Sequence, residues 1–208
     1  MSAPSRRMRA RRSLVIRRFD HIGDRLGLAF LESPETGGDA VLERLREYLG
    51  DKLKLVKAEV SHDEITVEVE SNGWIDEGAR MAAAARDLHA KGARRGALAT
   101  YRDALELDPL NAEAVLGVGL ALAHQENFAD AFAALKRARE FGADGAELLI
   151  AMGRCAAALQ RGANAVAYYQ AALKLEPRNF VARRALRALG GKLAPSAPES
   201  GAVRSRHD

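Results

Sequence analysis

The sequence repeats itself with a fixed period. The segment around Pro109 matches the segment around Pro177: Ala-Leu-Glu-Leu-Asp-Pro-Leu-Asn at 104–111 and Ala-Leu-Lys-Leu-Glu-Pro-Arg-Asn at 172–179. The two segments are separated by two periods of about 34 residues each, a period typical of stacked helix-turn-helix arrays. Such arrays usually bind other proteins, so the period restricts the function as well as the fold.

Charge is spread unevenly along the chain. The formal net charge is +4, but residues 1–18 contain seven arginines and no acid, and the residues after 189 add one more positive charge. Subtracting both contributions leaves −4 for residues 19–189. Hydrophobic residues make up 48% of the chain and charged residues 29%, which predicts a mainly globular, acidic body that carries a basic arm.

Cysteine content and hydropathy bear on the compartment. The single cysteine, Cys155, excludes an internal disulfide and favours a reducing environment. No apolar run approaches the roughly 18 residues that a transmembrane helix needs, and Arg17 and Arg18 cut off the short apolar run before them, unlike a secretory signal. We therefore expect a cytoplasmic protein. The arginine-rich, acid-free start leaves a mitochondrial presequence as the alternative.

Composition divides the chain into four regions. Residues 1–12 form a basic arm that is expected to be disordered, and residues 13–73 form a small α+β segment. Residues 74–189 carry the repeats and a capping helix. Residues 190–208, rich in Gly, Pro and Ser, are expected to be a disordered tail.

The 13–73 segment is expected to have β-α-β-β order, with elements near residues 13–19, 39–49, 53–60 and 65–69. In the last of these, Ile65, Val67 and Val69 alternate with polar residues, which predicts a half-buried antiparallel strand. In the strand before it the alternation slips between Leu55 and Val56, which predicts a β-bulge. A unit of about 60 residues is marginal alone, so we expect it to pack on the repeats.

Residues 78–189 resemble the tetratricopeptide repeat (TPR) family. The repeats are 78–111, 112–145 and 146–179, followed by a capping helix at 180–189. The family's recurring positions are filled by small residues in the first helix (Ala85, Gly119, Gly153), alanine early in the second (Ala97, Ala131, Ala165), a large residue (Tyr101, Leu135, Tyr169) and a second alanine (Ala104, Ala138, Ala172). The middle repeat lacks the closing proline, and Gly142 and Gly145 are expected to break the helix instead. The resemblance implies a mainly α fold: a right-handed α-solenoid of three helix pairs plus the cap.

The resemblance also implies a concave groove, lined by the first helix of each pair, that holds a partner peptide. The matching positions are Ala82, Arg86, His89, Glu113, Leu116, Leu120, His124, Glu147, Ile150, Arg154 and Arg184. An apolar centre flanked by arginines suits a peptide with hydrophobic anchors and some acidic character. The alternative is that these residues pack on the 13–73 segment or on a second copy of the chain.

TPR proteins that bind the carboxyl terminus of heat-shock chaperones use lysines, asparagines and an arginine on these helices. Here the matching positions are Ala82, Arg86, Gly117, Glu147 and Ala151. Only Arg86 is suitable, and Glu147 would repel a carboxylate. The sequence therefore excludes this clamp.

No pattern for catalysis stands out. There is no phosphate-binding loop, no Cys-x-x-Cys and no Gly-x-Ser-x-Gly, so we expect no enzyme, no catalytic residue and no cofactor. His89 and His124 are expected to face each other, but without a thiolate or carboxylate they make a poor metal site, and no metal is expected. Cys155 is expected to be a buried structural thiol. An enzyme within residues 13–73 stays open as an alternative and would need a pocket with a perturbed carboxylate or histidine.

These patterns predict a non-enzymatic adaptor or scaffold that binds a partner peptide, chaperone-like within a larger assembly. The alternative function is electrostatic: the arm binds nucleic acid or an anionic membrane, while the repeats only self-associate. Its arginines are Arg6, Arg7, Arg9, Arg11 and Arg12. The arm has no aromatic residues for base stacking, so such binding would be nonspecific and salt-sensitive. A merely solubilising arm is equally compatible with the sequence.

Overall fold

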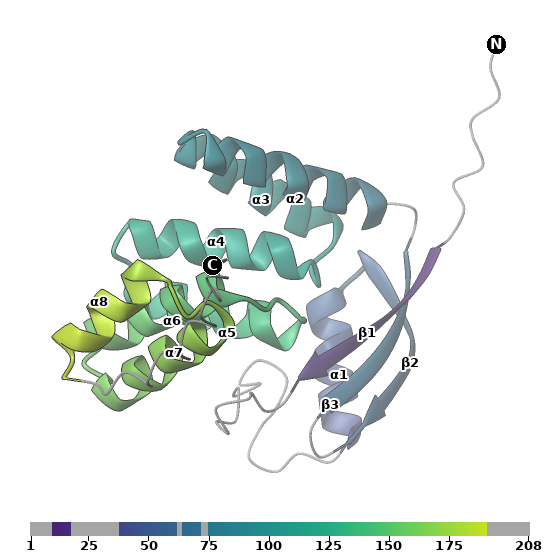
Figure 1. The fold of residues 1–208 in the computed structure, drawn as a ribbon. Coiled ribbons are helices and arrows are strands. Elements are labelled where there is room, and N and C mark those ends of the chain that lie inside the picture. Colours follow the sequence, from purple (N-terminus) through teal and green to yellow (C-terminus); the bar gives the residue numbers. More distant parts are fainter. Residues whose placement is uncertain (1–9, 18–37, 62–63, 72–74, 191–208) are drawn as a thin grey trace, which may run out of the picture.

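A computed structural model describes residues 10–17, 38–61, 64–71 and 75–190. Its strands are β1 (Ala10–Arg17), β2 (Leu53–Val60) and β3 (Glu64–Ser71), and its helices are α1 (Gly38–Leu49), α2 (Ile75–Ala90), α3 (Arg94–Leu107), α4 (Ala112–His124), α5 (Phe128–Glu140), α6 (Ala146–Ala158), α7 (Gly162–Leu175) and α8 (Phe180–Ala188). Figure 1 shows helices α2–α8 stacked as consecutive pairs, with the sheet and α1 beside α4 and α5. The fold is thus mainly helical with a small antiparallel sheet, as the sequence predicts. The expected disorder of residues 1–9 and 191–208 concerns segments outside the described residues.

The sheet has the order β1-β3-β2, and both pairings are antiparallel. The central strand β3 buries Ile65, Val67 and Val69 completely, because alternate side chains of a strand point to the same face. Helix α1 covers that face with Val41, Leu45 and Leu49, which are also buried. The predicted bulge in β2 is confirmed, since the pairing with β3 shifts register between Leu55 and Lys57.

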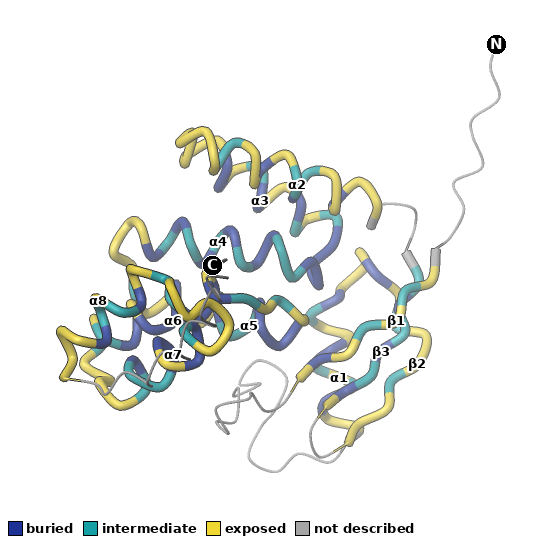
Figure 2. Tube along the Cα trace, viewed as in Figure 1, coloured by how far each residue is buried: buried dark blue, intermediate teal, exposed yellow. Residues whose placement is uncertain are grey.

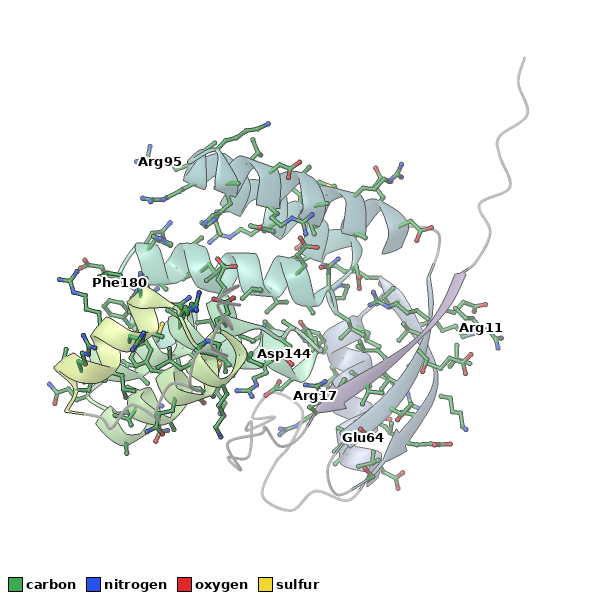
Figure 3. All side chains as sticks on the ribbon, viewed as in Figure 1. Arg11, Arg17, Glu64, Arg95, Asp144 and Phe180 are labelled. Carbon is green, nitrogen blue, oxygen red and sulfur yellow. The ribbon has the colours of Figure 1, made fainter. Side chains whose placement is uncertain are left out.

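Strand β1 begins at Ala10, so the boundary predicted for the basic arm is wrong. Arg11 and Arg12 belong to the sheet and project to opposite faces. Arg11 points away from the helical repeats (Figure 3) and lies 3.7 Å from Glu68 and 4.0 Å from Glu70 of β3. Arg12 reaches the turn between α3 and α4, where it binds Asp108. Acidic residues on both faces therefore hold these two arginines in the folded unit.

Within the second and third helix pairs, a glycine on the first helix faces a large residue on the second. A Cβ atom built on Gly119 would lie 2.8 Å from Leu135, and one on Gly153 would lie 2.9 Å from Tyr169. Neither contact is sterically allowed, so the glycines are what permits the two backbones to approach. The pairing of small and large residues predicted from the repeat period is confirmed.

The turns follow the same period. Asn111 and Asn179 accept hydrogen bonds from the backbone N–H groups of Ala114 and Ala182, and so cap α4 and α8. Between α5 and α6, Gly142 (φ 99°) and Gly145 (φ 122°) break the helix where the middle repeat lacks its proline.

The turn inside each pair also recurs, in the left-handed conformation. Gly92 (φ 79°), Glu126 (φ 61°) and Gln160 (φ 59°) occupy the same position in successive repeats. In each repeat the backbone N–H of the following residue donates a hydrogen bond to the carbonyl oxygen five residues earlier, for example Ala93 N–H to Leu88 O at 2.9 Å. Non-glycine residues fill two of these positions, so this regularity is hidden in the sequence.

The sheet and the repeats share one apolar core. Leu110, Val115, Ala138 and Phe141 of the helical repeats pack into the cluster of buried residues formed by the sheet and α1. In Figure 2 the buried part of the sheet faces α4 and α5, and the outer surfaces of α2 and α3 are exposed. Tyr48 of α1 adds a polar contact, because its hydroxyl donates a hydrogen bond to the carbonyl oxygen of Pro109 at 2.9 Å. The expectation that the 13–73 segment packs on the repeats is confirmed.

Helix α8 is the last described helix, and its outer surface is mixed, with arginines beside the exposed Phe180. Ala182 and Leu186 are fully buried, but Val181 (57% exposed) and Leu189 (38% exposed) are not. Arg187 occupies the position that Gly119 and Gly153 hold in earlier repeats. An arginine at this position obstructs the close approach of a further partner helix.

Candidate functional site

A hollow of about 540 Å³ opens between α2, α4 and the start of α6. We call it the central hollow, and its lining residues are Arg86, His89, Ala90, Tyr101, Ala112, Glu113, Leu116, Gly117, Leu120, Ala143, Asp144 and Glu147. Most of them come from the first helices of the repeats. Glu113, Leu116, Gly117 and Leu120 share one face of α4, because residues three, four and seven apart lie along the same side of a helix.

Tyr101 reaches the central hollow from behind, on helix α3. Its ring tip lies directly on Gly117, where an added Cβ would come within 2.2 Å of the ring carbons Cε2 and Cζ. The side chain is only 3% exposed, and no described residue forms a hydrogen bond with its hydroxyl. Burial, reinforced by the charge of Glu113, raises the pKa of Tyr101 to about 12. The phenol therefore stays protonated at neutral pH.

The polar part of the central hollow is acidic. Arg86 Nη1 lies 2.9 Å from Glu113 Oε1, which pairs α2 with α4. That carboxylate oxygen is buried and has no hydrogen-bond partner among the described residues, so the contact is an ion pair without hydrogen-bond geometry. Glu147 and Asp144 are exposed, and no described cation pairs with either one. Three carboxylates thus face a single guanidinium.

Leu116 and Leu120 supply the apolar wall. Both are half-buried and pack on the core between α4 and α7 with part of their surface, while the rest lines the central hollow. At the far rim, the rings of His89 and His124 meet edge to face with centroids 5.8 Å apart. The expectation that these two histidines face each other is confirmed. Among the described residues, no group of three or more histidine, cysteine or acidic side chains is arranged to hold a metal ion.

The structure brings together six of the eleven predicted groove residues. Arg86, His89, Glu113, Leu116, Leu120 and Glu147 line the central hollow, and His124 stands against His89 at its rim. The assignment of Ala82 is wrong: this residue is fully buried between α2 and α3, because one face of each first helix must pack on its own partner helix.

The remaining three predicted residues lie elsewhere. Ile150 is half-buried against the core of α4–α7. The Arg154 guanidinium donates a hydrogen bond to the carbonyl oxygen of Ala123. Arg184 lines a second hollow of about 300 Å³ on α8, together with Arg178, Phe180, Arg183 and Arg187; Figure 3 labels Phe180 at the end of the stack. The expected flanking arginines are therefore not part of the central hollow, apart from Arg86.

The sequence does not predict the other six lining residues in this role; they are Ala90, Tyr101, Ala112, Gly117, Ala143 and Asp144. Tyr101 was recognised only as the large residue of its repeat, which packs between helices. The available signal was Gly117, a second glycine shortly before Gly119 in a helix, because a glycine in a helix interior implies close approach of a neighbouring group. Asp144 lies in the proline-less loop, where the repeat pattern gives no guide.

Cys155 behaves as a structural thiol. It is buried in the core between α4 and α7, and burial raises the pKa of its thiol, which lowers the fraction of reactive thiolate. Among the described residues, no helix combines the length and the apolar character that crossing a bilayer requires.

Helices α2–α8, paired through small-to-large contacts that recur with the repeat period, have the TPR fold. This fold is typical of protein-binding domains that are not catalytic. No protein-family model and no curated protein matches the sequence.

Solved structures match the repeat region. The TPR domain of Arabidopsis OM64 is 22% identical, with a TM-score of 0.51 over 56% of this chain and 97% of that domain. The first TPR domain of Spaghetti (RPAP3), bound to the HSP90 peptide SRMEEVD, is 23% identical, with a TM-score of 0.50 over 55% of this chain and 91% of the other. The first TPR domain of human RPAP3 is 23% identical, with a TM-score of 0.48 over 54% of this chain and 89% of the other. The likenesses to the OM64 and Spaghetti domains show the fold of the helical repeats.

Proposed function

We propose that the chain is a non-enzymatic adaptor whose central hollow holds an extended segment of a partner protein. The observation that carries this proposal is the half-exposed apolar wall of Leu116 and Leu120 beside polar groups that no described residue satisfies. A concave, partly apolar site with a few convergent polar groups is the usual form of a binding site. A peptide-bound TPR domain among the structural likenesses supports the same reading.

The peptide class differs from that of the HSP90 tail. SRMEEVD carries three acids and a terminal carboxylate, whereas the central hollow presents Glu113, Asp144 and Glu147. Like charges at such short range repel one another. We infer that the partner segment is not an acidic carboxyl terminus.

A displayed library of random peptides, selected on the full chain, tests the proposal. Peptides enriched on the wild type should lose binding to Leu120→Gln, which makes the apolar wall polar at similar size. The matched control is Leu175→Gln, an exposed leucine at the end of α7 away from the central hollow. Equal binding of the selected peptides to both variants would refute the proposal.

The alternative is an electrostatic tether to nucleic acid or an anionic membrane, with the repeats in self-association. The observation that favours it is the cluster of Arg183, Arg184 and Arg187 around Phe180 on α8, since arginines and an exposed aromatic ring suit phosphate-bearing ligands. Because β1 begins at Ala10, the deletion that isolates the arm is residues 2–9. If this deletion abolishes both peptide binding and the salt-sensitive binding to nucleic acid or anionic membranes, the result favours the tether.

A further inference from the structure

The charge of the central hollow is opposite to the one expected from the sequence. Arg86 is paired with Glu113 at 2.9 Å, which leaves two carboxylates, Asp144 and Glu147, without a cationic partner among the described residues. Of the other arginines assigned to the groove, Arg154 is bonded to a backbone carbonyl and Arg184 lines a different hollow. The site therefore has an excess of negative charge and attracts cations.

We propose that the central hollow is a subsite for a lysine or arginine side chain of the partner segment. The proposal rests on the peptide-binding function above and names the chemistry of its ligand. Glu147 holds the cationic head together with the Tyr101 hydroxyl, and Glu113 shares its charge between this head and Arg86. Leu116 and Leu120 pack on the methylene stem.

Tyr101 is a second indication of a ligand in the central hollow, in addition to the acidic side chains. It is only 3% exposed and lines the central hollow, and no described residue forms a hydrogen bond with its hydroxyl, which therefore stays available to a ligand. A protonated phenol oxygen accepts a hydrogen bond from an ammonium or guanidinium N–H. Glu113 and Glu147 line the same hollow as Tyr101, so one cationic group in the hollow is near all three.

The apolar wall fits the same side chain. Lysine and arginine carry three or four methylene groups below the charge, and these prefer apolar surface while the head stays polar. On α4, Glu113 is followed by Leu116 and Leu120 along one face. A basic side chain lying along this face meets leucines with its stem and a carboxylate with its head.

The first measurement is the composition of the peptides selected on the full chain. We expect lysine or arginine next to aliphatic residues. A synthetic selected peptide is then titrated against purified variants by fluorescence anisotropy, at low and at high salt.

Charge reversal at Glu147 gives the decisive comparison. Glu147→Lys should weaken binding about tenfold, which corresponds to roughly 1.4 kcal/mol, and the loss should shrink at high salt because salt screens exposed charges. The matched control is Asp103→Lys, the same change of charge at an exposed site on α3 outside the central hollow, which should leave binding within about twofold. Tyr101→Phe removes only the hydroxyl and should weaken binding about fivefold.

The outcomes separate the two proposals. If the selected peptides lack basic residues, or bind Glu147→Lys and wild type equally, yet lose binding to Leu120→Gln, the cationic subsite is refuted and the adaptor function stands. If no peptide is enriched, or Leu120→Gln binds as well as wild type, both proposals are refuted. Circular dichroism of each variant confirms that the helices are intact.

Discussion

Arg12 of β1 donates two hydrogen bonds to Asp108, the residue before the proline that closes the first repeat. Nη1 lies 2.9 Å from Oδ2 and Nη2 lies 3.0 Å from Oδ1. Asp108 is completely buried, and Arg12 is about one-third exposed at 31%. Asp108 also accepts a hydrogen bond from the backbone N–H of Leu110 at 3.2 Å. The pair connects the sheet to the first turn between repeats.

Removing Arg12 should therefore destabilise the fold. Arg12→Met leaves a buried carboxylate without its partner, and breaking a buried ion pair in this way costs about 3–5 kcal/mol. We expect the low end of that range, because Asp108 can take up a proton instead. Arg11→Met is the matched control: Arg11 is exposed and its two glutamates lie 3.7 and 4.0 Å away, so its loss should cost less than about 1 kcal/mol. Urea denaturation followed by circular dichroism compares the two, and equal losses would contradict this account.

The same pair predicts a dependence of stability on pH. Burial, only partly offset by Arg12, raises the pKa of the Asp108 carboxyl above its usual value. The contribution of Asp108 to the free energy of unfolding is then fully present below the pKa of an aspartate in the unfolded chain, about 3.9. This contribution is lost as the pH rises through the pKa that Asp108 has in the folded state. The reference variant is Asp108→Asn, because its amide side chain does not titrate.

Urea denaturation over a series of pH values provides the measurement. The free energy of unfolding of the wild type, relative to Asp108→Asn, should fall as the pH rises through this window. In the Arg12→Met background the fall should extend to higher pH, because the guanidinium no longer lowers the pKa of Asp108. A difference that stays constant with pH would show that burial of Asp108 does not perturb its titration.

Gly117 should tolerate no side chain. In Gly117→Ala the new methyl group would lie 2.2 Å from two ring carbons of Tyr101, and such overpacking costs about 1–3 kcal/mol. Gly96→Ala, in helix α3, is the control: its nearest neighbour is Leu88 Cδ1 at 3.9 Å, so alanine should stabilise the helix by about 0.5–1 kcal/mol. Opposite changes in melting temperature confirm the prediction, and a stabilising Gly117→Ala would show that Tyr101 does not pack there.

Cys155 should be unreactive in the folded protein. It is buried, and its raised pKa leaves little thiolate at neutral pH. A thiol reagent should label none in the native state and one per chain after unfolding in urea. Ala158→Cys places a second thiol at an exposed position of the same helix and should label rapidly. Fast native labelling of the wild type would mean that the helices around Cys155 open readily.

The sequence alone predicted the repeat architecture in detail. Periodic small residues and the alternating strand around Val67 are local or periodic signals, and the structure confirms them. The boundary of the basic arm could not be predicted in this way. Arg12 lies in a strand that pairs with β3, and it bonds Asp108, which lies 96 residues away in the chain; no local pattern predicts such contacts.

The candidate site was predicted only in part for a related reason. The period says which helix face looks into the concave side, and six residues of the central hollow follow from it. It does not say how far a side chain reaches from the second helix, so Tyr101 was assigned to packing alone. The period also does not show which charged side chains already form ion pairs, such as Arg86 with Glu113.

The repeat period by itself thus determined the helix pairs and the face they present, because helical periodicity and close packing are properties of short segments. Only the tertiary structure decided where the sheet attaches, that Asp108 is buried under Arg12, and that the central hollow is acidic with Tyr101 at its base. These three features depend on contacts between residues that are far apart in the chain. The net charge of the central hollow, for example, depends on which of its side chains already form ion pairs.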